Sequence, residues 1–349
     1  MATEKKKNEI VFDDGLIHYD SKYVISANGF TNYGATCYLN SLMQCFFSNP
    51  AVFQTLEKYA EDETIKKNAL ARELLRIYRL SKDGKNITGE MSKIWEIVLG
   101  LSAARSDRVK LTRGQQDAHE GFMLLMDVLE YVPHIQRLFQ HRTQITLHCH
   151  ECDKIVSVKE ETHVAFDVQS DLKTEQHAKF KKVDKNYDKS MSLNEFIRSQ
   201  NGFVDDDYIC ANAECKVKGV KFKNTRLVMI PEILVVLLKK YKKKEATPFP
   251  EQLYFIAKGG THRMEFDLVA QSEHSGGQSG GHYWAICKRG DGKWYNLNDS
   301  GVSPSKPGPT KHSYMLFYNY ARTVKLATPT KSPKVVYELA EHLKGTHVV

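Results

Sequence analysis

From Gly29 to Phe47 the chain reads GFTNYGATCYLNSLMQCFF, a loop of glycine, asparagine and threonine that leads into an apolar run with helical spacing. The pattern predicts that Cys37 lies at the start of that helix. Free N–H groups and the positive end of the helix macrodipole stabilise a thiolate, so we expect a lowered pKa for Cys37. The thiolate is the attacking species, which makes Cys37 a candidate nucleophile. A buried structural cysteine is the alternative that this stretch leaves open.

Asn32 lies in the same loop, close enough to Cys37 for its side-chain amide to return beside the sulfur. An amide N–H at that point would donate to the oxyanion of a tetrahedral intermediate, and backbone N–H groups at the helix start would complete the oxyanion hole.

A candidate base lies near the other end of the chain. The run from His274 to Ile286 reads HSGGQSGGHYWAI, which predicts a flexible glycine loop that enters an apolar strand at His282. After a predicted turn, the next strand ends at Asn298 and Asp299. Antiparallel strands would return one of these two side chains to the imidazole, where it would accept an N–H bond. A lone histidine at a strand start is more often structural, but Cys37 and His282 together predict a nucleophile with its general base.

Four cysteines form two short pairs, Cys149 with Cys152 and Cys210 with Cys215. Two such loops can surround one tetrahedral zinc ion through four thiolates. Because four thiolates leave no open coordination position, this zinc would be structural. His148 and His150 flank the first loop as substitute ligands, and reduced cysteines without metal are the remaining alternative.

The composition is that of an ordinary globular protein, with 41% hydrophobic and 26% charged residues among 349. No apolar run approaches the ~18 residues of a membrane-spanning helix, and the N-terminus lacks the apolar core of a secretory signal. We therefore expect no membrane partner and a cytosolic or nuclear location. The net charge of +8 comes from 50 basic and 42 acidic residues that are mixed along the chain, which does not favour a nucleic-acid partner.

The spacing of apolar residues changes along the chain. From Cys37 to Tyr131 they recur every three or four residues, which predicts helices, whereas from Gln144 onward short alternating runs predict strands. Helices followed by a sheet indicate an α+β fold. Strands are expected at 144–147, 154–158, 164–168, 233–238, 265–270, 283–288, 293–297 and 314–318. We also expect an exposed insertion from Ser170 to Lys189 and a short helix at 336–343.

The stretches Gly29 to Phe47 and Gly280 to Ser300 resemble the cysteine and histidine boxes of the ubiquitin-specific protease family. Gly114 to Phe122 and Pro231 to Tyr241 are similar to two further signatures of that family. The resemblance implies a papain-like cysteine protease with a helical thumb, β-rich zinc-bearing fingers and a β-sheet palm. The implied organisation is a flexible arm at 1–22, one catalytic domain at 23–320 and a tail at 321–349, with the thumb at about 23–138, the fingers at about 139–226 and the palm at about 227–320.

The activity that the resemblance implies is thiol-dependent hydrolysis after the C-terminal glycine of ubiquitin, through an acyl-enzyme thioester. It implies Cys37 as nucleophile, His282 as base, Asn298 as the orienting third member and Asn32 in the oxyanion hole. Asp299 is the neighbouring candidate for the third member. Many family members have aspartate where this chain has Asn298, so here an amide carbonyl would have to accept the imidazole N–H, and Asp299 could share the role. It also implies one structural zinc on the four cysteines and a monomeric catalytic domain with ubiquitin and ubiquitinated proteins as partners.

Substrate contacts can be expected from the tail of ubiquitin, which ends in two glycines and carries arginines. The glycine segment from His274 to Gly281, which includes Gly280, would form one wall of a narrow channel. Asp117 and Glu120 would bind the arginines, with helix-start capping as the alternative. A related modifier as substrate, an inactive ubiquitin-binding module and a zinc-dependent nucleic-acid binder are the competing functions.

Overall fold

The computed structural model describes residues 20–104, 114, 116–149, 151–152, 154–169, 202–204, 209–218, 221–239, 246–257, 261–277 and 280–327. Three expectations therefore fall outside the described residues: most of the N-terminal arm, the insertion from Ser170 to Lys189 and the helix at 336–343.

Helices make up the N-terminal part of the described chain, as the apolar spacing predicted. A 3-10 turn, η1 (Ser21–Tyr23), comes first. The helices that follow are α1 (Cys37–Phe46), α2 (Pro50–Lys58), α3 (Glu63–Lys67), α4 (Ala69–Lys82), α5 (Met91–Ala104), α6 (Ala118–Leu129) and α7 (Pro133–Gln136). Side-chain caps mark several starts; Asn68, for example, accepts from the backbone N–H of Ala71 at 3.0 Å before α4. None of the described helices has the length and apolar character to cross a membrane.

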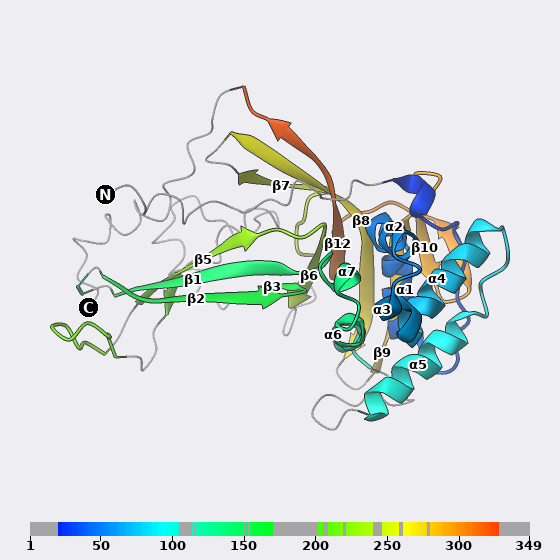
Figure 1. Ribbon diagram of the computed structural model, residues 1–349, viewed down its shortest axis with the longest axis horizontal. Coiled ribbons are helices and arrows are strands. Elements are labelled where there is room, and N and C mark those ends of the chain that lie inside the picture. The colour runs from blue at the N-terminus through cyan, green and yellow to red at the C-terminus, as the bar shows by residue number, and fades with distance from the viewer. Residues whose placement is uncertain are drawn as a thin grey trace.

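Helix α1 lies at the centre of the helical part, and all ten of its residues are buried. It packs between α6 and the strands β8 (His262–Gly277) and β9 (Gly280–Lys288), whereas α4 and α5 lie on the outside (Figure 1). Phe46 at its end stacks on Phe139 at a centroid distance of 5.3 Å and lies 6.3 Å from Phe122. A helix buried on every side holds its first residue in place from several directions.

The strands form two sheets. The smaller sheet has the order β2-β1-β5-β4 and extends away from the helices (Figure 1); its strands are β1 (His141–Cys149), β2 (Ile155–His163), β4 (Gly202–Val204) and β5 (Lys221–Met229). The larger sheet has the order β11-β10-β9-β8-β12-β6-β3, with β7 paired to β8. Its other strands are β3 (Phe166–Gln169), β6 (Ile233–Lys239), β7 (Gln252–Ala257), β10 (Trp294–Asn298), β11 (Gly301–Pro304) and β12 (Ser313–Lys325).

The α+β prediction is confirmed, and each expected strand overlaps an observed one. Strands β4, β5, β7 and β11 were not expected. Strand β3 lies in the part of the chain expected for the fingers, yet it pairs in parallel with β6 in the larger sheet. Phe166 and Val168 of β3 are buried against Leu234 and Val236 of β6, so apolar burial in the larger sheet decides this pairing.

Candidate active site

The predicted helix start is confirmed, because α1 begins at Cys37. The Cys37 side chain is 4% exposed, and burial is the largest influence on its thiol, raising the pKa above its ordinary value. The negative charge of Asp299 adds to this rise, whereas backbone N–H groups of Tyr283 and Tyr38 oppose it. The expectation of a lowered pKa is therefore wrong for this structure, since desolvation of the thiolate outweighs the helix start.

His282 and Asn298 meet as predicted across two antiparallel strands. Strand β9 carries His282, β10 ends at Asn298, and Leu297 pairs with Ala285 between them. His282 Nε2 lies 2.6 Å from Asn298 Oδ1. An amide oxygen only accepts, so the proton of the neutral ring resides on Nε2 and Nδ1 is left as the basic nitrogen.

Cys37 lies against the strand that carries His282. The backbone N–H of Tyr283, the residue after His282, lies near enough to the Cys37 sulfur to favour its thiolate and oppose the rise of its pKa. Between these described residues, however, no hydrogen bond joins the Cys37 sulfur to the imidazole. The candidate nucleophile and the candidate base thus lie on neighbouring elements. Proton transfer between them would require His282 Nδ1 to come within hydrogen-bond distance of the sulfur.

Asp299 serves a different group of residues from its neighbour Asn298. Its Oδ2 accepts from the Asn32 amide at 2.9 Å, and its Oδ1 accepts from the Asn40 amide at 2.8 Å. Its backbone carbonyl accepts from Phe30 N at 2.7 Å, with φ at 49° in the left-handed region that aspartate tolerates better than most residues. Of the two candidates for the third member, the structure joins Asn298 to His282.

The amide of Asn32 is held at both of its atoms. Oδ1 accepts from the backbone N–H of Gly34 at 3.0 Å and from that of Thr36 at 3.2 Å. Nδ2 uses one N–H for Asp299. A primary amide has two N–H donors, and among the described residues the second has no acceptor.

The glycine segment beside His282 is a paired hairpin rather than the flexible loop that the sequence suggested. Gly276 pairs with Gly281 and Gly277 with Gly280, while residues 278–279 at the tip lie outside the described chain. A Cβ on Gly281 would collide with Nε2 of His274, whose ring stacks on Tyr283 at 4.3 Å. Glycine is needed at 281 because the His274 ring occupies the space of a side chain.

Asp117 and Glu120 have unlike surroundings. Asp117 Oδ1 caps α6 by accepting from the backbone N–H groups of His119 at 2.7 Å and Glu120 at 3.2 Å. Its Oδ2 accepts from the hydroxyls of Tyr314 at 2.6 Å and Tyr283 at 3.3 Å. The capping alternative thus describes Asp117. The half-buried Glu120 carboxylate has no partner among the described residues, and burial, followed by the charge of Asp117, raises its pKa.

Three further residues of the site were not singled out from the sequence: Asn40, Tyr283 and Tyr314. A signal existed for Asn40, because a polar residue in a fully buried helix needs a partner. Its amide indeed donates to Asp299 and to the Thr31 carbonyl. The two tyrosines looked like ordinary strand residues, since nothing in their spacing indicates where a hydroxyl points.

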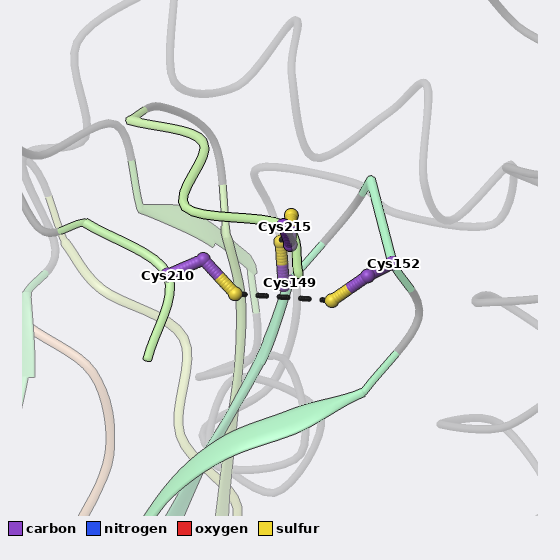
Figure 2. Close-up of side chains that lie close together, drawn as sticks. All are labelled: Cys149, Cys152, Cys210 and Cys215. Carbon is purple, nitrogen blue, oxygen red and sulfur yellow. Dashed lines mark hydrogen bonds between the residues drawn. The ribbon is translucent and has the colours of Figure 1, made fainter. Parts of the chain in front are cut away.

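The four cysteines lie together at the end of the smaller sheet (Figure 2). Their sulfurs are all within 4.8 Å of one another, and the separations of Cys149 from Cys215 and of Cys152 from Cys210 are each 3.8 Å. Thiolates about 2.3 Å from a tetrahedral zinc lie about 3.8 Å apart, whereas disulfide sulfurs lie about 2.05 Å apart. The geometry therefore fits one four-thiolate zinc. No histidine belongs to the described cluster, and His150 lies outside the described residues.

The sequence matches a known family over most of its length. The model of the family described as ubiquitin carboxyl-terminal hydrolase covers residues 28–318. Ubiquitin carboxyl-terminal hydrolase 26 of Arabidopsis thaliana is 26% identical over 301 residues, which are 79% of this chain and 26% of that protein. Ubiquitin carboxyl-terminal hydrolase 15 of Homo sapiens is 33% identical over 130 residues, which are 33% of this chain and 13% of that protein. The chain thus matches only a minor part of these relatives' own length.

Solved structures share the fold. The Ubp8/Sgf11/Sus1/Sgf73 DUB module of SAGA bound to ubiquitin aldehyde contains a chain with a TM-score of 0.67 at 18% identity, covering 87% of this chain and 72% of that one. The Ubp8-Sgf11-Sgf73-Sus1 SAGA DUB module gives a TM-score of 0.61 at 18% identity, covering 85% of this chain and 68% of that one. The likeness confirms the expected α+β papain-like fold.

Proposed function

Because the chain belongs to the ubiquitin carboxyl-terminal hydrolase family, we propose that it is a cysteine-type deubiquitinase that cleaves the isopeptide or peptide bond after the C-terminal glycine of ubiquitin. The observation that carries this proposal is the 2.6 Å contact of His282 with Asn298. The strand that holds His282, β9, packs on α1, the helix that begins at Cys37. The solved relative bound to ubiquitin aldehyde supports ubiquitin as the ligand.

In the proposed reaction, Cys37 attacks the carbonyl carbon of the last glycine of ubiquitin. His282 Nδ1 takes the thiol proton and then gives it to the leaving amine, so that the C–N bond breaks and a thioester to Cys37 remains. A water molecule, deprotonated by the same nitrogen, hydrolyses the thioester and restores the thiol. Asn298 keeps the ring oriented with its proton on Nε2 throughout.

The oxyanion of each tetrahedral intermediate would bind the free N–H of Asn32 and backbone N–H groups at the start of α1. Asp299 supports this role because it holds the other N–H of Asn32 at 2.9 Å and the amide of Asn40 at 2.8 Å. Donors that are already oriented need little reorganisation when negative charge develops. Asp299 is thus proposed as a positioning residue for the oxyanion hole and Asn298 as the third member of the triad.

The raised pKa of Cys37 implies that most of the thiol is protonated in the free protein at neutral pH. The proposal therefore requires that His282 approach the sulfur when substrate binds. Catalytic hydrogen bonds are often long before substrate arrives, so the separation in the free chain is compatible with this role.

The substrate channel is proposed to run along the glycine hairpin, with His274, Gly280 and Gly281 on one wall. Because glycines at 280 and 281 have no side chains, the backbone of a ligand such as Gly-Gly could approach the hairpin closely. Glu120, which has no partner among the described residues, is available for an arginine of the ubiquitin tail. Asp117, whose oxygens accept from the start of α6 and from two tyrosine hydroxyls, would instead hold the helix that carries Glu120 in place.

A structural zinc is proposed for Cys149, Cys152, Cys210 and Cys215. The ion would join the turn after β1 to the turn at 210–215, and its four thiolate ligands would leave no position for a catalytic water. We further propose that the catalytic domain is a monomer. A cytosolic or nuclear location stays a prediction.

A ubiquitin probe with a thiol-reactive C-terminus tests the function. Wild-type protein should form a covalent adduct, Cys37→Ala should form none, and Cys45→Ala, altered in the same helix, should form it like wild type. No adduct with wild type, or an adduct with Cys37→Ala, contradicts the proposal. Parallel probes made from related modifiers distinguish their processing from that of ubiquitin, and binding without an adduct would indicate an inactive binding module.

A further inference from the structure

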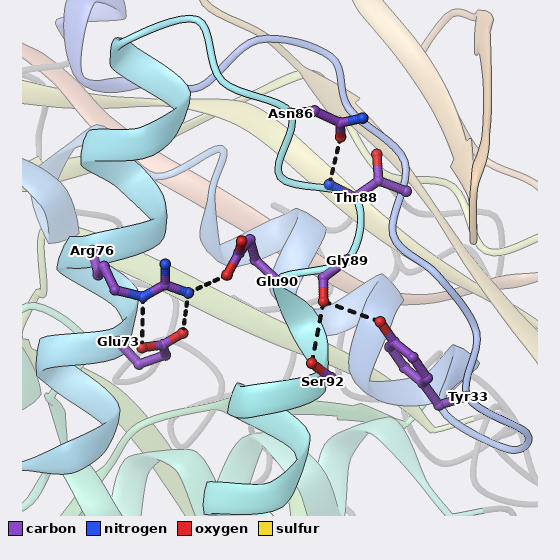
Figure 3. Close-up of polar contacts among 8 residues, drawn as sticks. All are labelled: Tyr33, Glu73, Arg76, Asn86, Thr88, Gly89, Glu90 and Ser92. Atoms are coloured by element: carbon purple, nitrogen blue, oxygen red, sulfur yellow. Dashed lines mark hydrogen bonds and ion pairs between the residues drawn. The ribbon is translucent and has the colours of Figure 1, made fainter.

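The segment from Asn86 to Glu90, between α4 and α5, lies against the loop that carries Asn32. The backbone N–H of Thr31 donates to the Thr88 carbonyl at 3.0 Å. The Tyr33 hydroxyl donates to the Gly89 carbonyl at 3.0 Å (Figure 3). The residues on both sides of Asn32 are thus bonded to two consecutive residues of one short segment.

Local hydrogen bonds hold this segment in shape. The backbone N–H of Thr88 donates to Asn86 Oδ1 at 2.9 Å, and the hydroxyl of Ser92 donates to the Gly89 carbonyl at 3.2 Å (Figure 3). A carbonyl oxygen has two lone pairs, so Gly89 can accept from Ser92 and Tyr33 together. The acceptor for Tyr33 is therefore already oriented by its own neighbours.

An arginine of α4 ties the segment to the rest of the helical part. Arg76 forms a two-pronged ion pair with Glu73, with N–O distances of 2.9 and 2.6 Å, and its Nη2 also contacts the carboxylate of Glu90 (Figure 3). The side chains of Glu73 and Glu90 are 12% and 28% exposed. Partly buried, two-pronged pairs of this kind are strong and geometrically specific.

We infer that Tyr33 is a positioning residue for the oxyanion hole, acting through Asn32 and supported by the segment Asn86 to Glu90. The inference rests on the proposed function of Asn32. The Tyr33 side chain is 39% exposed, so its ring contributes little to the core, and its hydroxyl is the group with a fixed partner. The alternative is an incidental surface hydrogen bond with no effect on Asn32.

The need for such a support follows from the loop itself. Gly34, next to Tyr33, has a φ of 116°, which glycine adopts readily because it has no side chain. The same lack of a side chain gives the backbone of this turn more conformational freedom. Small displacements of an oxyanion donor are costly, since a misplacement of about 1 Å can cost on the order of 10²-fold in rate. Bonds from Thr31 and Tyr33 restrict the backbone on both sides of the donor.

The test removes one oxygen atom. Tyr33→Phe should lower kcat for a fluorogenic ubiquitin amide on the order of five- to tenfold, the effect of one lost hydrogen bond, with KM unchanged within about twofold. Tyr131→Phe, an exposed tyrosine of the helical part, should behave like wild type. In an Asn32→Ala background, Tyr33→Phe should cause no further loss, because the residue through which it acts is gone. Wild-type kcat in Tyr33→Phe, or an equal loss in the Asn32→Ala background, would overturn the inference.

A measurement without turnover separates this inference from the proposed function. In protein labelled with ¹⁵N-asparagine, the Asn32 side-chain resonance, assigned by its loss in Asn32→Ala, should broaden or exchange faster with solvent in Tyr33→Phe than in Tyr131→Phe. An unchanged resonance contradicts the inference whether or not the protein is active. Absence of hydrolysis by wild type contradicts the proposed function alone, since the resonance still reports whether Tyr33 holds Asn32.

Discussion

The side-chain amide of Asn32 donates to Oδ2 of Asp299 at 2.9 Å, although 267 positions separate the two residues in sequence. The other oxygen of Asp299 binds Asn40 within α1. One carboxylate thus joins the loop before Cys37 and the helix that begins at Cys37 to the end of β10. Asn298, the preceding residue, points to His282 instead. Two consecutive residues therefore serve the two sides of the proposed reaction centre, and each can be altered separately.

Replacing Asp299 should damage the oxyanion hole. Asp299→Ala leaves the amides of Asn32 and Asn40 without their acceptor, so kcat should fall on the order of 10²- to 10³-fold, as for loss of an oxyanion donor. The double variant with Asn32→Ala should be little worse than either single variant, because both remove the same interaction. Steady-state kinetics with a ubiquitin amide measure this, and an activity within about twofold of wild type would sink the assignment.

Replacing Asn298 should affect the base. Asn298→Ala removes the acceptor for His282 Nε2, so the ring can rotate or change tautomer, and kcat should fall on the order of 10²-fold. Asn298→Asp, which keeps an oxygen acceptor, should retain much more activity than Asn298→Ala. Equal losses in the two variants would show that the 2.6 Å contact does not orient the imidazole.

Cys37 of the free protein should ionise late. Burial is the largest cause that raises the pKa of its thiol, and the negative charge of Asp299 is the second. The rate of alkylation by iodoacetamide should therefore rise with pH, with a midpoint above that of an unperturbed cysteine. Asp299→Asn removes a nearby negative charge and should lower this midpoint. Mass spectrometry of the Cys37 peptide across a pH series gives the midpoint. A value near or below pH 7 in wild type would indicate a thiolate that already pairs with His282.

The cysteine cluster should bind one zinc ion. Native mass spectrometry of freshly reduced protein should show one zinc per chain, and Cys152→Ser should lose it and unfold at a lower temperature. Cys37→Ser, a matched change outside the cluster, should keep both the metal and the melting temperature. Reduced wild-type protein without metal would contradict the zinc assignment.

His141 should make the protein less stable in mild acid. It is the first residue of β1 and is 1% exposed, and burial, with a smaller contribution from His163, lowers its pKa to about 4. Between about pH 6.5 and 4 the unfolded chain binds this proton and the folded chain does not, so the free energy of unfolding falls as pH falls, by about 3 kcal/mol at most. Urea unfolding at several pH values gives the free energy of unfolding as a function of pH. This free energy should fall less steeply between about pH 6.5 and 4 in His141→Leu than in wild type. An unchanged slope would mean that other groups cause the acid sensitivity.

Much of the fold and part of the site could be predicted from local patterns. The glycine and asparagine loop before an apolar run located the start of α1 at Cys37, because helix starts depend on nearby residues. The antiparallel strands on either side of Gly290 to Gly292 brought the end of β10, with Asn298 and Asp299, to the level of His282, since a short turn leaves little freedom of register. The two cysteine pairs predicted a cluster that the structure confirms.

Other properties depend on contacts between distant parts of the chain. No local pattern distinguishes Asn298 from Asp299 as partner of His282, because that choice follows from the backbone turn at φ 49°. The two hydroxyls on Asp117 come from Tyr283 and Tyr314, which follow far along the chain. Strand β3 joined the larger sheet because its apolar side chains are buried there.

Cys37, the proposed nucleophile, shows which properties depend on the sequence and which on the tertiary structure. The residues around Cys37 are enough to predict a thiol at a helix start, because capping and the helix dipole act within about one turn. The pKa of that thiol instead depends on burial and on Asp299, and both arise only when α1 is enclosed by the sheet. Desolvation and long-range charge are properties of the assembled fold. The sequence was therefore enough to predict a cysteine thiol at the start of a helix, whereas the pKa of that thiol depends on the tertiary structure.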